Sequence, residues 1–265
     1  MDALTTHNLT VGYPAAKGKT PACVLSDLNL RLPEETVTVL IGANGIGKST
    51  LLRTLAGTQR QLSGSIEMTG TNIDDMSVLD RAKKLALVYT DRTGGGGLTV
   101  SELVSLGRQP YTGFLGRLSK NDREICRDAM EAVGILHKAD SYMARLSDGE
   151  RQKTMIARAL AQQTPIIMLD EPTSFLDVAS RLEIMQLLGR LAKDEKKTVL
   201  LSTHDIAPAM SVADRLWIVP GNGQPIIEGS RERLIADGVM DKVFPGRQIT
   251  YDTCANDFRF KTPKN

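Results

Sequence analysis

Cysteine is scarce in this chain of 265 residues, which has three: Cys23, Cys126 and Cys254. They are too far apart for a CxxC pair or a disulfide framework, so we expect reduced, mostly structural thiols. An excess of one charge is also missing, because 33 Lys and Arg residues face 31 Asp and Glu residues, for a formal net charge of +2. This balance excludes a polybasic nucleic-acid binder and an acidic tail protein.

The sequence also lacks long hydrophobic runs. The apolar runs at 166–169 and 199–201 are far shorter than the ~20 residues that cross a bilayer. The first residues, MDALTTHNLTVGY, have neither the basic start nor the apolar stretch of a signal peptide, so we expect the chain to remain in the cytosol. With 41% hydrophobic and 24% charged residues, the chain can bury a full core, which excludes global disorder.

Short β-rich runs alternate with helical stretches along the chain. Strands are predicted at 37–41, 166–169 and 198–202, with helices after each, which is typical of an α/β fold with a mainly parallel sheet. The helix predicted from Val178 has apolar residues at helical spacing, which predicts one buried face. These residues are Leu182, Met185, Leu188 and Leu191.

The strand pattern disappears between residues 94 and 158, where apolar periodicity predicts an inserted helical lobe. Four glycines at 94–97 predict a mobile connection at its edge. Residues 220–223 predict a hairpin turn between two strands, and the stretch from Asp241 shows no clear period.

The motif GANGIGKST at 42–50 follows an apolar strand and opens a helix. Glycines at such positions let backbone amides approach a phosphate chain, Lys48 supplies positive charge and Ser49 a hydroxyl for Mg²⁺. A glycine-rich turn that binds nothing is the alternative, and the strand and helix context argues against it. The nucleotide contacts predicted here are Gly42, Ala43, Asn44, Gly45, Ile46, Gly47, Lys48, Ser49 and Thr50.

The run IIMLDEP at 166–172 is an apolar strand that ends in two carboxylates. Such a strand can deliver Asp170 to the magnesium side of a phosphate site and place Glu171 to polarise a water. Alone, the run is better explained as a strand that ends in a solvated acidic turn. The upstream phosphate loop favours the catalytic interpretation.

Together with further motifs, these features resemble the ATP-binding subunits of ABC transporters over nearly the whole chain. The further motifs are LTVGY with Tyr13, LSDGERQ at 146–152, SFLD at 174–177 and STHD at 202–205. The resemblance implies an α/β fold: a P-loop NTPase core with a mainly parallel sheet, an N-terminal antiparallel β region and an inserted helical lobe. It implies one ABC ATPase domain over 1–265. Within it we expect a nucleotide-binding core at 1–91 and 159–240, a helical lobe at 92–158 and a C-terminal extension of unassigned role at 241–265.

The resemblance further implies a head-to-tail dimer of two copies. Each of two ATP molecules lies between the Lys48 loop of one copy and the LSDGERQ signature of the other. In this scheme Tyr13 stacks on adenine, Ser147 and Gly149 reach the γ-phosphate across the interface, and Asp177 lies at the dimer seam. The implied catalytic residues are Lys48, Glu171 and His204, with Ser49 and Asp170 as ligands of Mg²⁺.

Several of these residues have ordinary alternative roles. Tyr13 can be a simple strand aromatic, and His204 a histidine satisfied within the fold. Ser147 with Glu150 matches a capping box at a helix start, which is compatible with a phosphate contact.

Two departures from the family pattern concern hydrolysis. Asp91 stands where the family has a magnesium-binding Gln, and its carboxylate is a third candidate ligand of Mg²⁺. In the signature, Asp148 and Glu150 replace a glycine and a glutamine. A carboxylate is favoured at a helix start and repelled by triphosphate, so Asp148 has opposing effects.

The segment LGRQPYTGFLGRLSKNDREI at 106–125 resembles the branch that energises importers of iron chelates, haem or cobalamin, although it also fits a simple loop and helix start. The resemblance implies an ATPase, producing ADP and phosphate, at the cytoplasmic face of the inner membrane. Its partners would be polytopic permease subunits and, indirectly, a substrate-binding protein. We expect 92–117 to form a groove for a permease helix, with Tyr111, Phe114 and Leu115 as apolar anchors, unless these side chains pack internally.

Two other functions stay open at this point. One is an ABC-type ATPase acting on nucleic acid or ribosomes. The chain has no duplicated cassette, long coiled coil or basic arm, so we expect no nucleic-acid partner. The other is a non-hydrolytic scaffold that uses ATP only to dimerise, for which Asp91 and Asp148 are the only support.

Overall fold

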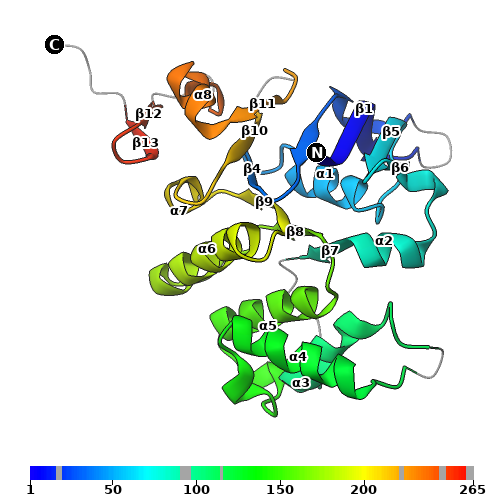
Figure 1. Cartoon of the computed structure of the whole chain (residues 1–265). Helices are drawn as coiled ribbons and strands as arrows, with labels where there is room; N and C mark the ends of the chain where they lie inside the picture. Colours follow the sequence, from blue (N-terminus) through cyan, green and yellow to red (C-terminus); the bar gives the residue numbers. More distant parts are fainter. Residues whose placement is uncertain (16–19, 90–96, 114–115, 221–223, 245–248, 261–265) are drawn as a thin grey trace.

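The computed structural model describes residues 1–15, 20–89, 97–113, 116–220, 224–244 and 249–260. Two β-sheets and a helical lobe make up the molecule (Figure 1). The lobe lies at the end of the molecule away from the N-terminal sheet, and the larger sheet runs between them.

The larger sheet has six strands in the order β11-β10-β4-β9-β8-β7. Their bounds are β4 Val37–Gly42, β7 Leu85–Val88, β8 Ile166–Asp170, β9 Thr198–Thr203, β10 Arg215–Val219 and β11 Ile227–Ser230. All neighbours are parallel except β10 and β11. The strands β4, β8 and β9 are buried throughout, as expected for parallel strands covered on both faces. The α/β fold class with a mainly parallel sheet is confirmed.

The second sheet is antiparallel and contains the N-terminal strands, as predicted. Its strands are β1 Asp2–Tyr13, β2 Ala22–Leu28, β3 Arg31–Pro33, β5 Ser63–Met68 and β6 Thr71–Asn72. Helix α1, Lys48–Leu55, contributes Leu51, Leu52 and Leu55 to one buried cluster with β1 and with Leu40 and Trp217 of the larger sheet. This packing fixes the start of α1 at the end of β4.

The opposite face of the larger sheet packs against α6, Val178–Lys193. Met185, Leu188 and Leu191 are buried there as predicted. The prediction was wrong for Leu182, which is 47% exposed. Leu182 is one turn after the helix start, before the buried face of α6 begins at Ile184.

The lobe contains α3 Val100–Ser105, α4 Lys120–Ala132 and α5 Asp148–Ala161, and α5 thus continues beyond residue 158. Each helix begins with a reciprocal capping box. In α5 the box joins Ser147 and Glu150, which confirms the sequence prediction. Such boxes satisfy the first amides of each helix and fix where it begins.

Two short hairpins follow the larger helices. β10 and β11 pair antiparallel, as predicted, and residues 221–223 of their connection lie outside the described residues. Beyond α7 Ile206–Met210 and α8 Arg231–Ala236, strands β12 Ile249–Asp252 and β13 Asp257–Phe260 form a second hairpin. Phe258 packs edge-on against Phe244 and Tyr251, with ring centroids 5.1 and 5.4 Å apart. This aromatic contact holds the hairpin to the core.

Helix α2, Val78–Lys84, precedes β7 and contacts the lobe, where Gln162 donates to the Ala82 carbonyl and Lys83 lies over the Tyr111 ring. Within the described part of the chain, no helix is long and apolar enough to span a membrane. The cysteines are free, with Cys126 buried in α4 and Cys23 and Cys254 exposed.

Candidate nucleotide-binding site

The loop between β4 and α1 requires glycine at two positions with positive φ. Gly45 has φ 75° and Gly47 has φ 109°, and a Cβ at position 47 would lie 2.3 Å from Cγ1 of Val24. Residues other than glycine are strained at such positive φ values. Ile46 packs against the neighbouring apolar cluster. The path of the loop backbone therefore depends on these two glycines.

Lys48 is buried at the base of this loop, with 5% of its surface exposed. Its Nζ donates to the carbonyl oxygens of Gly42, at 2.9 Å, and Ala43, at 3.3 Å. Glu171 Oε1 lies 3.8 Å away. Burial lowers the pKa of the ammonium group, and the carboxylates of Glu171 and Asp170 partly oppose this effect. The ammonium is thus held where it can meet a phosphate.

Asp170 ends β8 and is buried. The parallel register places Ser202 of β9 opposite Asp170, and Ser202 Oγ donates to Asp170 Oδ1 at 2.7 Å. The Asp170 carboxylate, at the end of β8, and the Ser49 hydroxyl, in the first turn of α1, are oxygen donors of the kind that hard cations such as Mg²⁺ take together with substrate phosphates. The residues present therefore fit that ion.

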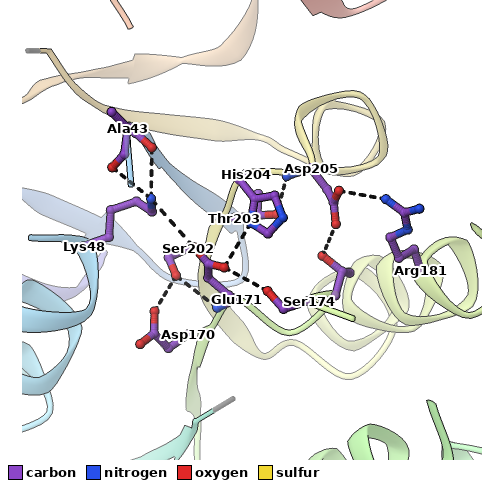
Figure 2. Close-up of polar contacts among 12 residues, drawn as sticks. Ala43, Lys48, Asp170, Glu171, Ser174, Arg181, Ser202, Thr203, His204 and Asp205 are labelled. Carbon is purple, nitrogen blue, oxygen red and sulfur yellow. Dashed lines mark hydrogen bonds and ion pairs between the residues drawn. The ribbon is translucent and has the colours of Figure 1, made fainter. Parts of the chain in front are cut away.

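Glu171 follows with a left-handed backbone, φ 50°, which turns the chain after β8. Its amide donates to the Ser202 carbonyl, at 3.1 Å, and hydroxyl, at 3.0 Å. Its carboxylate Oε2 accepts from Ser174 Oγ at 2.8 Å and lies 3.0 Å from His204 Nδ1. Figure 2 shows this carboxylate between Lys48, Ser174 and His204. A carboxylate held in this way is suited to orient and deprotonate a water.

A cavity of about 300 Å³ opens above the loop. Its lining residues are Tyr13, Asn44, Gly45, Gly47, Lys48, Ser49, Thr50 and Glu171. Tyr13, at the end of β1, is 51% exposed, and its hydroxyl lies 3.3 Å from Thr50 Oγ1. The exposed ring borders the cavity, where a planar base can stack on it. The structure thus brings together the glycine-rich loop, the Tyr13 ring and the Glu171 carboxylate around one cavity.

Other residues predicted for the site lie elsewhere. Ser147 and Gly149 begin α5 and are not among the residues that line the cavity. A Cβ at position 149 would lie 2.9 Å from Oγ of Ser180, so the start of α5 packs on the start of α6. Asp177 caps α6 by accepting from the Ser180 amide at 2.9 Å. Asp91 lies outside the described residues.

The sequence motifs contain two site residues to which the sequence analysis gave no role. Ser202 and Ser174 fall inside the STHD and SFLD segments, but their partners, Asp170 and Glu171, become visible only when the strands are paired. In the described residues, no group of three or more His, Cys, Asp or Glu side chains could hold a metal ion by itself.

The fold and this site define a nucleotide-binding ATPase of the P-loop class. Residues 25–174 match the sequence profile described as ABC transporter. The chain belongs to the ABC transporter family, as an ATP-binding ATPase subunit.

Characterised relatives match almost the whole chain. It is 38% identical over 244 residues to the iron(3+)-hydroxamate import ATP-binding protein FhuC of Bacillus subtilis, covering 92% of this chain and 88% of the relative. It is 34% identical over 246 residues to the ferric enterobactin transport ATP-binding protein FepC of Escherichia coli, covering 93% and 88%.

Solved structures of ABC transporter proteins also match this chain. A metal-chelate type ABC transporter in an inward-facing conformation matches with a TM-score of 0.78 and 26% identity, covering 98% of this chain and 96% of that chain. A dimeric bacterial ABC transporter cassette matches with a TM-score of 0.74 and 27% identity, covering 86% and 98%. The family resemblance drawn from the motifs is confirmed.

Proposed function

We propose that this subunit hydrolyses ATP to power the import of an iron chelate, haem or cobalamin through a separate membrane permease. The observation that supports the proposal most is the similarity to iron-chelate import ATP-binding proteins over more than nine-tenths of the chain. The relatives' names concern iron chelates, so haem and cobalamin rest on the segment at 106–125 alone.

The proposed roles follow from the contacts in the site. Lys48 and the loop amides bind the phosphates, and Ser49 and Asp170 hold Mg²⁺, whose charge offsets that of the phosphates. Glu171 accepts the proton of the attacking water, since its carboxylate borders the cavity and is oriented by Ser174. His204, hydrogen-bonded to the same carboxylate, supports the γ-phosphate. Asp91 stays a candidate ligand of Mg²⁺.

A second copy of the chain completes the site in this proposal. Ser147 and Gly149 lie outside the cavity of their own copy, so the proposal assigns them to the ATP of the partner copy. The start of α5 would then direct its first amides and its dipole at the γ-phosphate. Asp177 would lie at the seam between the copies.

The permease is proposed to dock beside Tyr111 and the start of α2. The Tyr111 ring stacks on Arg108, 4.1 Å from its guanidinium carbon, and its hydroxyl donates to the Gln162 carbonyl at 2.9 Å. Lys83 Nζ, on α2, lies 5.8 Å from the same ring, and Val78 and Leu79 of α2 are exposed. Tyr111 is thus both packed and partly exposed, and these apolar groups suit the docking of a helix. Residues 92–96, Phe114 and Leu115 of the expected groove lie outside the described residues.

The complex is proposed to sit at the cytoplasmic face of the inner membrane and to receive its cargo from a substrate-binding protein. Uptake of radioactive iron as a ferric hydroxamate, in vesicles that contain the permease and this subunit, tests the function. Wild-type subunit should support ATP-dependent uptake, whereas Lys48→Ala should support none and should lose most affinity for a fluorescent ATP analogue, because the amides cannot replace the ammonium charge. The exposed Lys196→Ala is the control. The proposal would be contradicted if the rate of ATP hydrolysis did not change when the permease is added and increased when RNA or ribosomes are added.

Docking has its own test. Val78→Ser with Leu79→Ser should leave basal ATPase activity and the thermal midpoint unchanged, since both side chains are exposed, yet reduce co-purification with the permease. Undiminished co-purification would contradict docking at α2. The Tyr111→Ser and Phe114→Ser pair should lose co-purification in the same way.

A further inference from the structure

An ion pair outside the cavity connects α6 to the segment that carries His204. Arg181, in the first turns of α6, donates from a terminal guanidinium nitrogen to Asp205 Oδ1 at 2.9 Å. The second oxygen, Asp205 Oδ2, accepts from Thr173 Oγ1 at 2.6 Å. The side chains are 32% exposed for Arg181 and 12% for Asp205, so this is a partly buried charge pair. Figure 2 shows it beside the catalytic carboxylate.

The position of Asp205 in the chain gives this pair its significance. Asp205 directly follows His204, and its amide donates to Thr203 Oγ1 at 2.9 Å, which shapes the turn between β9 and α7. Its two carboxylate oxygens then fasten that turn to α6 on one side and to the segment after β8 on the other. Neither Arg181 nor Asp205 lines the cavity.

We propose that Arg181 is a positioning residue that acts through Asp205 to hold His204 against Glu171. The inference rests on the proposed function, in which Glu171 and His204 act on ATP. The His204 ring is half-exposed, and the contact of its Nδ1 with Glu171 Oε2, at 3.0 Å, depends on where the turn places it. Without Arg181, the Asp205 carboxylate keeps Thr173 but loses its charge partner, and the turn loses its fastening to α6.

The same pair connects the start of α6 to the catalytic residues. The Arg181 amide donates to the Asp177 carbonyl at 3.0 Å, so Arg181 belongs to the first hydrogen-bonded turns of the helix that Asp177 caps. A displacement of that helix start therefore moves Arg181 and, through Asp205, His204. Binding of a second copy at Asp177 would in this way reach the histidine that faces Glu171.

The experiment compares Arg181→Met, which keeps the aliphatic stem and removes the charge, with Arg181→Lys and with the exposed Arg190→Met on the same helix. We expect Arg181→Met to lower kcat about tenfold, with KM and the Kd of a fluorescent ATP analogue unchanged within about twofold. Arg181→Lys should restore part of kcat, and Arg190→Met should match wild type. An unchanged kcat in Arg181→Met would overturn the inference.

A double variant separates positioning from a general structural role. In a His204→Ala background, Arg181→Met should lower kcat no further, because its effect passes through the histidine. An equal fall in both backgrounds would overturn the inference. If Arg181→Met does not fold, Asp205→Asn, which removes the charge pair from the other side and keeps an acceptor for Thr173, answers the same question. Turnover at the wild-type rate in His204→Ala would refute the proposed role of His204. Reduced turnover in His204→Ala together with full turnover in Arg181→Met would refute only the inference about Arg181.

Discussion

The Ser202 hydroxyl lies between the two acidic residues of the site. It donates to the Asp170 carboxylate at 2.7 Å and accepts from the Glu171 amide at 3.0 Å. Asp170 is proposed to bind Mg²⁺ and Glu171 to act as the base. The one Ser202 hydroxyl therefore orients both the carboxylate of Asp170 and the backbone of Glu171. Ser202 is fully buried, and no water can replace it without a rearrangement.

Replacing Ser202 by Ala should impair the use of Mg²⁺ more than the binding of nucleotide. Asp170 then loses one hydrogen bond that orients it, and a hydrogen bond to a charged group contributes about 1.5–3 kcal/mol. We expect the Mg²⁺ concentration for half-maximal ATPase activity to rise several-fold in a steady-state assay. Ser211→Ala, which removes an exposed hydroxyl, is the control. The same Mg²⁺ dependence in both variants would mean that Asp170 is positioned without Ser202.

Replacing Glu171 by Gln should keep ATP binding and reduce turnover by at least ~10²-fold, because an amide cannot accept the proton of water. Gln can still accept from Ser174, so the local structure should survive. Size-exclusion chromatography with ATP should show a trapped dimer accumulating. Glu195→Gln, an exposed carboxylate before β9, serves as the control. Hydrolysis at the wild-type rate by Glu171→Gln would show that the base is another group.

Replacing Glu150 by Gln should promote ATP-driven dimerisation. Hydrogen bonds from the Ser147 amide and hydroxyl and the nearby Lys138 hold the pKa of Glu150 below its usual range, so the side chain is charged at neutral pH. Gln preserves the capping box and removes a negative charge beside the proposed phosphate contact. We expect dimer formation at lower ATP concentration, with an effect that shrinks in salt.

Replacing Lys138 by Met should shift ATP-driven dimerisation in the opposite direction to Glu150→Gln. Lys138 Nζ lies 3.4 Å from Glu150 Oε1, and its loss leaves the carboxylate without its cation. Dimerisation should then require more ATP. Identical dimerisation curves for both variants would show that the charge of Glu150 does not act on the partner's nucleotide.

Replacing Asp122 by Asn should destabilise the protein at neutral pH but not in strong acid. Hydrogen bonds from the Ser119 hydroxyl and amide, and then from Arg108, lower the pKa of Asp122 from 3.8 to about 2. The charged form is thus favoured by folding, and its stabilisation is present above pH 3.8 and disappears as the pH falls through about 2. The urea midpoints of wild type and Asp122→Asn should differ by a constant amount from pH ~5 to ~7. The difference should shrink as the pH falls below ~4.

The exposed Asp128→Asn, on the same helix, should behave like wild type throughout this range. A gap between Asp122→Asn and wild type that stays constant down to the lowest pH would contradict the assignment.

Local sequence signals predicted the parts of this protein that depend on neighbours in the chain. The phosphate loop rests on glycines and Lys48 within nine residues, and the Ser147 capping box on a spacing of three. The buried strands β4, β8 and β9 contain apolar runs, so their type and their positions along the chain could be predicted, whereas their order in the sheet could not. The pairing of Asp170 with Ser202 and of Arg181 with Asp205 depends on strand register and helix placement, which no local pattern contains.

Two features were hidden for other physical reasons. Leu182 has the spacing of a core residue, but it lies in the first turns of α6, where no residue is buried before Ile184. The strands β12 and β13 have four residues each, too few for a period to be visible, and they are held by the aromatic contacts of Phe258.

The two ends of α5 are attached to the core in different ways. After its last turn, Gln162 donates from its side-chain amide to the carbonyls of Ala82 and Leu85, at 2.5 and 3.0 Å, whereas at its first turn the backbone of Gly149 rests against Ser180. The start of α5 therefore has no room to come closer to α6, whereas its separation from α6 is opposed by the Lys153–Glu183 ion pair and by the apolar cluster that the two helices share.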